Sequence, residues 1–261
     1  MAGVFILGYN TGIVKNTNKT EGTELTNVLS NPISIAAHEL KNPLAILKNY
    51  LEVLREERVG KINEKQKEYL GDSLETVMEM LELVREFLEV SKIEENCFQV
   101  EKDPVDIGEI IKDITSNYSI WARANNSQIL FDNDEDIPNV CTDSIKIRQV
   151  IENLISNAIK YKTKNAGVIH ISLEKKDENV ILTCENNGIS IPKDDIPKIF
   201  KKFYRSEDAV RMQPNGTGLG LYISRAIVEG SGGRMWVENN NGDGVTFFVK
   251  LPIYKKEIVY E

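Results

Sequence analysis

Two series of apolar residues with heptad spacing, in the first third of the chain, restrict its fold more than any other feature. The series are Ala37, Leu40, Leu44, Leu47, Leu51 and Leu54, followed by Leu70, Leu74, Val77, Leu81, Val84 and Leu88. Steps of three and four residues place each series on one narrow stripe of an α-helix. Residues 60–63 interrupt the pattern, and Asn63 is a residue type that caps helix N-termini. The sequence therefore predicts a helical hairpin within residues 24–98.

One hairpin with two narrow apolar stripes leaves much of both stripes uncovered. Two hairpins that pair as a four-helix bundle bury them. We therefore expect residues 24–98 to form a homodimer. Residues 1–23 are rich in Gly, Asn and Thr, and we expect them to form a flexible leader.

The remainder of the chain has a mixed helix and strand pattern. We expect a linker at residues 99–104, one domain at 105–254 and a tail at 255–261. Helices are predicted at 106–124, 144–161 and 217–229, and strands at 128–131, 168–173, 180–184, 235–238 and 246–251. This grouping predicts an α+β fold in which the hairpin is followed by a two-layer α/β sandwich.

Composition excludes several classes of protein. The formal net charge of −8 argues against a nucleic-acid partner, because binding to nucleic-acid phosphates needs a basic surface. The apolar stretches are too short to span a membrane. The cysteines, Cys97, Cys141 and Cys184, are scattered without metal-site spacing, which fits a reducing compartment. We expect a cytoplasmic protein with no membrane span in this chain.

The sequence contains two histidines, and they differ in their surroundings. His170 lies on the polar side of a predicted strand, where a solvated side chain is expected. His38 lies two residues before Leu40, about 200° around the helix, so it faces water. Glu39 is adjacent, and Asn42 lies one turn further on the same side. An imidazole is a nucleophile near neutral pH, and a neighbouring carboxylate can hold the proton of one ring nitrogen.

Residues 38–44, HELKNPL, resemble the phosphoacceptor box of sensor histidine kinases at all seven positions. The resemblance implies that His38 is phosphorylated, that Glu39 assists as a base, and that Asn42 orients water when the protein dephosphorylates its partner. It also implies an ATP-binding domain of the GHKL type, ATP and Mg²⁺ as cofactors, and a response-regulator aspartate as the acceptor.

Residues 153–161, NLISNAIKY, resemble the asparagine box of the same family. Asn153, Asn157 and Lys160 share one helix face, because they are four and then three residues apart. Lys160 can neutralise phosphate charge, and Tyr161 is placed to pack on a base. An amide oxygen is a ligand that Mg²⁺ accepts, and the resemblance implies that Asn157 holds this metal.

Residues 184–192, CENNGISIP, resemble the first glycine box, Asp-x-Gly-x-Gly-Ile-Pro, with two departures. Asn186 replaces the aspartate that accepts a hydrogen bond from the adenine amino group, and Ser190 replaces the second glycine, while Gly188 and Ile191 match. Compared with an aspartate, Asn186 keeps an acceptor oxygen but carries no charge, and the weaker hydrogen bond costs on the order of 1 kcal/mol of binding free energy. Ser190 adds a Cβ that is expected to strain the turn or crowd the base. Both departures predict weaker ATP binding.

Residues 199–205, IFKKFYR, resemble the phenylalanine box. We expect Phe200 and Phe203 to anchor the base of a mobile lid. Lys202 and Arg205 are expected to approach phosphates.

A glycine-rich turn at residues 216–221, GTGLGL, opens a predicted helix and resembles a second glycine box. Such a turn presents backbone N–H groups and the positive end of the helix to a phosphate. The polar residues 206–215 before it suit a lid that closes over ATP. The residues expected to contact the nucleotide here are Gly216, Thr217, Gly218, Leu219 and Gly220.

Three functions agree with these motifs to different degrees. The first is a histidine autokinase that phosphorylates His38 and passes the phosphoryl group to a response regulator. The second is a degenerate kinase with weak or absent ATP binding, which acts as a dimeric response-regulator-binding module or phosphatase. The third is a chaperone- or topoisomerase-type ATPase, which would need a glutamate beside the metal asparagine. Glu152 lies on a different helix face from Asn157, which disfavours the third function.

Overall fold

The computed structural model describes residues 32–134, 136–162, 166–240 and 244–255. The predicted leader lies outside these residues, as does the predicted tail apart from Lys255. Among the helices described, none combines the length and apolar composition needed to cross a membrane.

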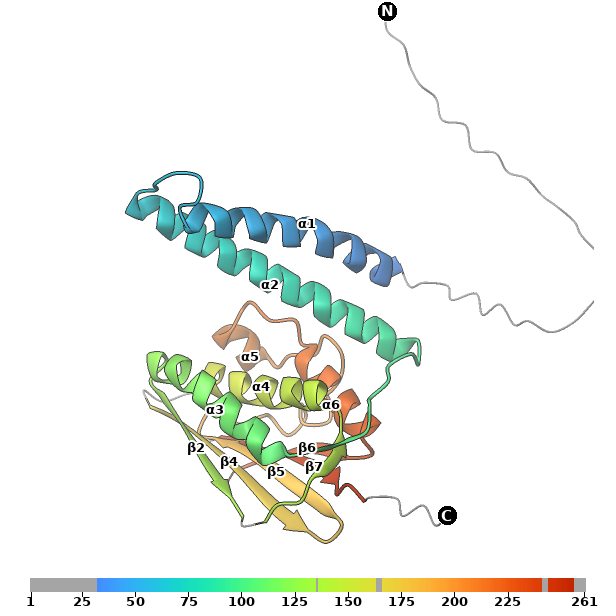
Figure 1. Ribbon diagram of the computed structural model, residues 1–261. Helices are drawn as coiled ribbons and strands as arrows, with labels where there is room; N and C mark the ends of the chain where they lie inside the picture. Colours follow the sequence, from blue (N-terminus) through green and yellow to red (C-terminus); the bar gives the residue numbers. More distant parts are fainter. Residues whose placement is uncertain (1–31, 135, 163–165, 241–243, 256–261) are drawn as a thin grey trace, which may run out of the picture. The chain divides into compact units, whose positions relative to one another are not determined.

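The described chain begins with the predicted hairpin, formed by α1 (Pro32–Arg55) and α2 (Glu64–Glu94) (Figure 1). Asn63 caps α2: its side chain accepts the Gln66 N–H at 2.9 Å, and the Gln66 side chain accepts the Asn63 N–H at 2.8 Å. This reciprocal pair satisfies two backbone donors that the first helical turn would otherwise leave unpaired. The break predicted between the two heptad series is therefore where the structure places the turn.

The apolar stripes of the hairpin are only partly covered within one chain. Ala37, Leu74 and Val77 are buried, whereas Leu40 and Leu47 keep 54% and 44% of their surface exposed. A helical face with large apolar side chains in water is unusual unless another surface covers it.

The second part of the chain is a two-layer α/β sandwich, as the sequence predicted. The helices α3, α4 and α6 form one layer and a five-stranded sheet forms the other (Figure 1). The sheet order is β2-β4-β5-β7-β6, in which β2 and β4 are parallel and the other neighbours are antiparallel. The helices are α3 (Ile107–Ala124), α4 (Ser144–Lys160) and α6 (Gly220–Gly230), and the strands are β2 (Ser127–Asn133), β4 (Gly167–Lys176), β5 (Asn179–Asn186), β6 (Arg234–Asn239) and β7 (Val245–Pro252).

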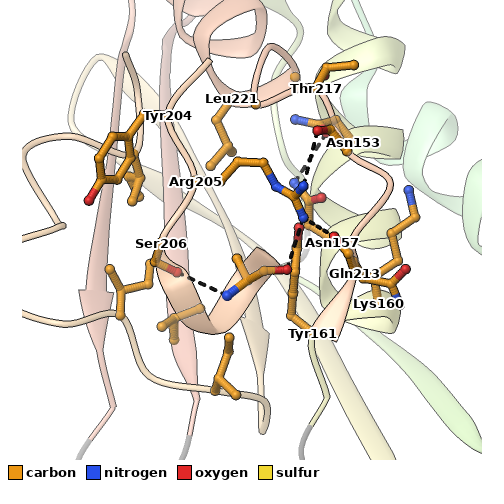
Figure 2. A pocket seen from close by; sticks show the side chains of 18 of the residues that line it. Asn153, Asn157, Lys160, Tyr161, Tyr204, Arg205, Ser206, Gln213, Thr217 and Leu221 are labelled. Atoms are coloured by element: carbon orange, nitrogen blue, oxygen red, sulfur yellow. Dashed lines mark hydrogen bonds between the residues drawn. The ribbon is translucent and has the colours of Figure 1, made fainter. Parts of the chain in front are cut away.

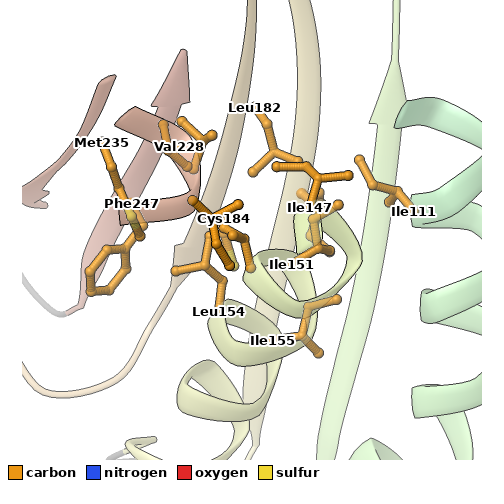
Figure 3. Close-up of a cluster of buried hydrophobic side chains, with 14 of the residues drawn as sticks. Ile111, Ile147, Ile151, Leu154, Ile155, Leu182, Cys184, Val228, Met235 and Phe247 are labelled. Carbon is orange, nitrogen blue, oxygen red and sulfur yellow. The ribbon is translucent and has the colours of Figure 1, made fainter. Parts of the chain in front are cut away.

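The core between the layers is built by one face of α4 and alternate residues of β5. Ile151 and Leu154 of α4 lie close to Leu182 and Cys184 of β5 (Figure 3). Since side chains alternate along a strand, the next inward position of β5 is Asn186, which is also buried. The strand therefore carries one polar side chain to the helix-facing side of the sheet.

The structure differs from the predictions at three short segments. The predicted linker 99–104 ends inside β1 (Asp103–Val105), which pairs antiparallel with β3 (Val140–Thr142). A three-residue strand is too short to show an alternating pattern. The predicted flexible lid contains a short helix, α5 (Glu207–Met212), capped by the side chain of Ser206. The predicted helix at 217–229 begins only at Gly220, after Gly218 with φ of +70°.

Candidate functional site

A cavity lies at one end of α4, bordered by the segment after β5 and by residues 204–221 (Figure 2). Most residues that the sequence predicted to bind a nucleotide line it: Asn153, Asn157, Lys160, Tyr161, Asn186, Ile191, Arg205, Gly216, Thr217, Gly218 and Gly220. Five predicted residues do not line it: Gly188, Ser190, Lys202, Phe203 and Leu219. Segments distant in sequence thus converge on one site.

A chain of amide hydrogen bonds orients the polar face of α4. The Asn157 amide donates to Asn153 Oδ1 at 3.2 Å, and the Asn153 amide donates to the buried Ser224 hydroxyl at 2.9 Å. Because Asn157 uses its nitrogen in this chain, its Oδ1 is the atom left for a ligand. Such an oxygen suits a hard divalent cation.

Among the described residues, no group of three or more histidine, cysteine, aspartate or glutamate side chains is placed to hold a metal ion. A Mg²⁺ ion bound by Asn157 therefore needs further oxygens from a bound polyanion and from water, which is an arrangement that Mg²⁺ commonly adopts. The donor set fits a metal carried in by a triphosphate.

The start of α6 lies against this amide chain. A Cβ built on Gly220 would lie 2.6 Å from Asn153 Oδ1, so only glycine allows this approach. Thr217 orders the turn before the helix, because its hydroxyl accepts the Leu219 N–H at 3.1 Å. Leu219 itself is fully buried and supplies packing. The first N–H groups of α6 lack partners within the helix, so they favour an anion at this end of the cavity.

The segment after β5 is fixed to the end of α4. The Ile189 N–H donates to the Tyr161 carbonyl at 3.0 Å, and a Cβ on Gly188 would lie 2.2 Å from the same oxygen. Gly188 is therefore needed for close packing and has no direct place in the cavity. Asn239 holds the next part of the segment, since its side chain bonds both the N–H and the carbonyl of Ile191.

Asn186 is the buried polar group of this wall, with 7% of its surface exposed. Its Oδ1 accepts the N–H of Gly188 at 3.0 Å and the N–H of Val245 at 3.4 Å. The acceptor oxygen expected to meet an adenine amino group is thus already used by the backbone.

The expected effects of Ser190 are absent. Its side chain is exposed and does not line the cavity. Among the residues that the structure describes, those with left-handed backbone do not include Ser190, so its Cβ causes no strain of that kind. The prediction that Ser190 strains the turn or crowds a base was wrong.

Phe203 and Lys202 face α2 instead of the cavity. The Phe203 ring lies 6.3 Å from the ring of Phe87, and Lys202 pairs with Glu94. Phe203 has φ of +63°, and its N–H donates to the carbonyl of Gly218 at 3.0 Å. The expected roles of Lys202 at a phosphate and of Phe203 under the lid do not match these positions. Phe200 packs against the core.

Arg205 was expected to contact a phosphate, but its side chain instead holds the lid segment. Its guanidinium donates to the carbonyls of Ala209 at 2.9 Å, Pro214 at 3.1 Å and Gly216 at 3.1 Å, and also to that of Gln213. Four carbonyl acceptors occupy both terminal nitrogens. Arg205 therefore holds residues 209–216 as a closed loop beside the cavity.

Glu86 and Tyr204 also line the cavity, although the sequence motifs assigned neither of them to the site. Glu86 comes from α2, and burial is the main cause that raises the pKa of its carboxyl. Nothing in the helical pattern distinguishes Glu86 from neighbouring glutamates. Tyr204 lies inside the predicted phenylalanine box; its hydroxyl donates to Asp195 at 2.5 Å, and this bond is the main reason why its pKa is raised to about 12.

The three residues of the predicted phosphoacceptor site are together on α1. His38, Glu39 and Asn42 all have exposed side chains, and none of them lines the cavity. The exposed histidine and the cavity therefore come from different elements of the chain.

The fold and the cavity together define a class: proteins in which a helical hairpin precedes an α/β sandwich of the histidine kinase and HSP90 type. Residues 29–96 match the His Kinase A (phospho-acceptor) domain. Residues 142–255 match the family described as histidine kinase-, DNA gyrase B-, and HSP90-like ATPase. The two matched families follow one another along the chain in the order that the motifs predicted.

Similar proteins agree with this class. The sensor protein kinase WalK of Staphylococcus aureus is 31% identical over 251 residues, covering 95% of this chain and 59% of WalK. The catalytic domain of histidine kinase ThkA is 32% identical, with a TM-score of 0.52 over 59% of this chain and 98% of that domain. Full-length ShkA, crystallised with AMPPNP, shares the fold at 23% identity, with a TM-score of 0.70 over 86% of this chain and 46% of ShkA.

The chain belongs to the sensor histidine kinase family. It spans about three fifths of the length of this WalK relative and about half of ShkA.

Proposed function

We propose that this protein is a histidine autokinase, which transfers the γ-phosphoryl group of ATP to His38 and then to an aspartate of a response-regulator receiver domain. The observation that carries the proposal is the combination in one chain of an exposed histidine on the hairpin and a cavity equipped for a triphosphate. The complex of ShkA with AMPPNP, an ATP analogue, supports a nucleotide as the ligand.

The cavity suggests how the nucleotide lies. Lys160 and the start of α6 at Gly220 offer positive charge and free N–H groups to the triphosphate. The lining also includes Val245 and Phe247, which suit the faces of a base. The lid held by Arg205 then covers the phosphates and limits the access of water.

Asn157 would hold Mg²⁺ through its Oδ1, together with oxygens of the triphosphate and water. When bound, the metal neutralises charge on the β- and γ-phosphates. The amide chain through Asn153 to Ser224 keeps Asn157 in the orientation that this requires.

The transfer itself needs little covalent chemistry from the protein. The unprotonated ring nitrogen of His38 forms the bond to the γ-phosphorus, and the bond from that phosphorus to the β–γ bridging oxygen breaks, so that ADP leaves. The proton on the other ring nitrogen passes to Glu39. The protein contributes mainly positioning and charge neutralisation.

The hairpin is proposed as the dimerisation and phosphotransfer domain, residues 24–98, joined by residues 99–104 to the catalytic domain, 105–254. Exposed apolar side chains on α1, which include Leu40, Ile46 and Leu47, support a second copy of the hairpin as the partner. Asn42 would orient water in a separate hydrolytic reaction, in which water attacks the aspartyl phosphate of the response regulator and inorganic phosphate leaves. The three unpaired cysteines fit a cytoplasmic location.

The proposal is tested by incubating the purified chain with Mg²⁺ and γ-labelled ATP, beside Asn157→Ala and the matched surface variant Asn139→Ala. We expect label that is lost in acid and stable in base, at a rate that falls at least roughly tenfold in Asn157→Ala and stays unchanged in Asn139→Ala. Equal labelling of all three proteins, or label that survives acid, contradicts the proposal.

A further inference from the structure

We propose that the base end of the cavity selects a purine with a carbonyl oxygen at position 6, as in guanine or hypoxanthine, over adenine. The inference deepens the proposed function and rests on it, because it concerns which nucleoside triphosphate the kinase site binds most tightly. Asn186 is the residue that determines the selection.

The orientation of the Asn186 amide follows from its partners. The N–H groups of Gly188 and Val245 both point at the same side-chain atom, at 3.0 and 3.4 Å. A backbone N–H can only donate, so this atom must be the carbonyl oxygen. The reversed amide would place an NH₂ group against two donors and leave two buried N–H groups unsatisfied. The nitrogen Nδ2 therefore occupies the other branch of the side chain.

The nitrogen of Asn186 is available to a ligand. Among the residues that the structure describes, Nδ2 has no acceptor, although Asn186 keeps only 7% of its surface exposed; the residue lines the cavity. Among the described residues, no buried side-chain nitrogen or oxygen lacks a hydrogen-bond partner, so Nδ2 is open to the cavity, where a ligand or water can pair with it. The cavity wall at this point thus presents a hydrogen-bond donor.

The neighbours of Asn186 on the sheet that also line the cavity are apolar and suit a base. Val245 is its partner on β7, and Phe247 is two residues further along the same strand face. Lys160 and the glycine turn at 216–220 supply the cationic and N–H-rich part of the cavity. A nucleotide with its triphosphate at Lys160 would therefore direct its base to the apolar part that holds Asn186.

Hydrogen-bond chemistry then distinguishes the purines. Adenine carries an amino group at position 6, so that an amide N–H of Asn186 would face another donor. Guanine and hypoxanthine carry a carbonyl oxygen there, which accepts the bond. A site that leaves a buried polar group unpaired in one complex and pairs it in the other commonly discriminates by roughly tenfold or more.

The test compares ATP with inosine triphosphate (ITP), which has the carbonyl at position 6 and lacks the 2-amino group of guanine. Dissociation constants of both nucleotides with Mg²⁺ are measured by calorimetry on the full chain, on Asn186→Asp and on Asn139→Asp. The aspartate keeps an oxygen for the two backbone N–H groups and places a second, charged oxygen at the base. Asn139 is exposed and lies outside the cavity, so its variant controls for the added charge.

We expect the parent chain and Asn139→Asp to bind ITP roughly tenfold more tightly than ATP, and Asn186→Asp to reverse this preference. Equal affinities in the parent chain, or tighter binding of ATP, overturn the inference and leave the proposed function standing. If neither nucleotide binds to any of the three proteins, the inference and the proposed function both fail.

Discussion

At the scale of single residues, burial decides which side chains are chemically available. Cys184 lies in the core between α4 and the sheet, and burial raises the pKa of its thiol to about 12. Cys97 is exposed just beyond α2. Since the thiolate is the reactive form, Cys184 is protected both by its burial and by its raised pKa, whereas Cys97 is accessible.

We therefore predict that iodoacetamide at mildly alkaline pH modifies Cys97 in the folded protein and leaves Cys184 unmodified. The raised pKa keeps Cys184 protonated in the folded state, and unfolding in urea lowers it to the ordinary value and exposes it. Mass spectrometry of peptides from native and unfolded samples measures both sites. Rapid alkylation of Cys184 without unfolding would show that the core is not packed as described.

The polar face of α4 was predictable from the sequence, because the spacing of Asn153, Asn157 and Lys160 determines which side of a helix they share. The partners of the Asn186 oxygen were not predictable. One of them, Val245, is 59 residues away in sequence and reaches Asn186 only through the pairing of β5 and β7. An amide that is turned over presents a hydrogen-bond donor where it had an acceptor. Its orientation depends on contacts between segments that are distant in sequence.

At the scale of elements, the lid is held by one side chain. The guanidinium of Arg205 bonds four backbone carbonyls between residues 209 and 216, a pattern that requires its fork of donors. Lysine at this position keeps the charge but offers one ammonium group, which cannot reach all four acceptors. The lid of an Arg205→Lys variant should therefore open more often.

We predict that trypsin cleaves Arg205→Lys after Arg211 several-fold faster than the parent chain, because cleavage of a loop follows its local opening. The matched control is Arg225→Lys, in which the arginine pairs only with Glu229 on its own helix. Both variants keep a trypsin site at the substituted position. Identical cleavage rates after Arg211 in the three proteins would mean that Arg205 does not hold the lid.

Long helices and strands could be predicted from the sequence, and very short ones could not. Both hairpin helices and the five strands of the main sheet carry enough residues for their periodicity to be read. The strands β1 and β3 have three residues each, and α5 has six. Phe203 and Lys202 were expected at the lid and at a phosphate because residues 199–205 resemble the phenylalanine box, but in the structure Phe203 lies near Phe87 and Lys202 pairs with Glu94, both on α2.

At the scale of the whole molecule, the hairpin carries apolar surface that one chain does not cover. Leu40, Leu47 and Tyr50 keep 54%, 44% and 66% of their surface exposed. The heptad spacing of Leu40 and Leu47 is what a four-helix bundle requires. A second copy of the hairpin would satisfy this spacing, and the stability of the proposed dimer would then depend on α1.

We predict that Leu47→Asp converts the protein from a dimer to a monomer in light scattering, since a buried charge without a partner is costly. The control is Val59→Asp in the hairpin turn, where the side chain is 70% exposed. This variant should remain dimeric. A parent chain that is monomeric at micromolar concentration, or a dimer that withstands Leu47→Asp, contradicts this interface.

The most direct test of the central claim is to map the phosphorylated residue. The chain has two histidines, His38 on α1 and His170, which bonds Asp132 at 2.6 Å across the sheet. After incubation with Mg²⁺ and either ATP or ITP, mass spectrometry under neutral conditions should find one phosphoryl group on the peptide that contains His38, and none in His38→Ala. A phosphoryl group on His170 or on a hydroxyl residue, or modification that persists in His38→Ala, would contradict the proposed kinase.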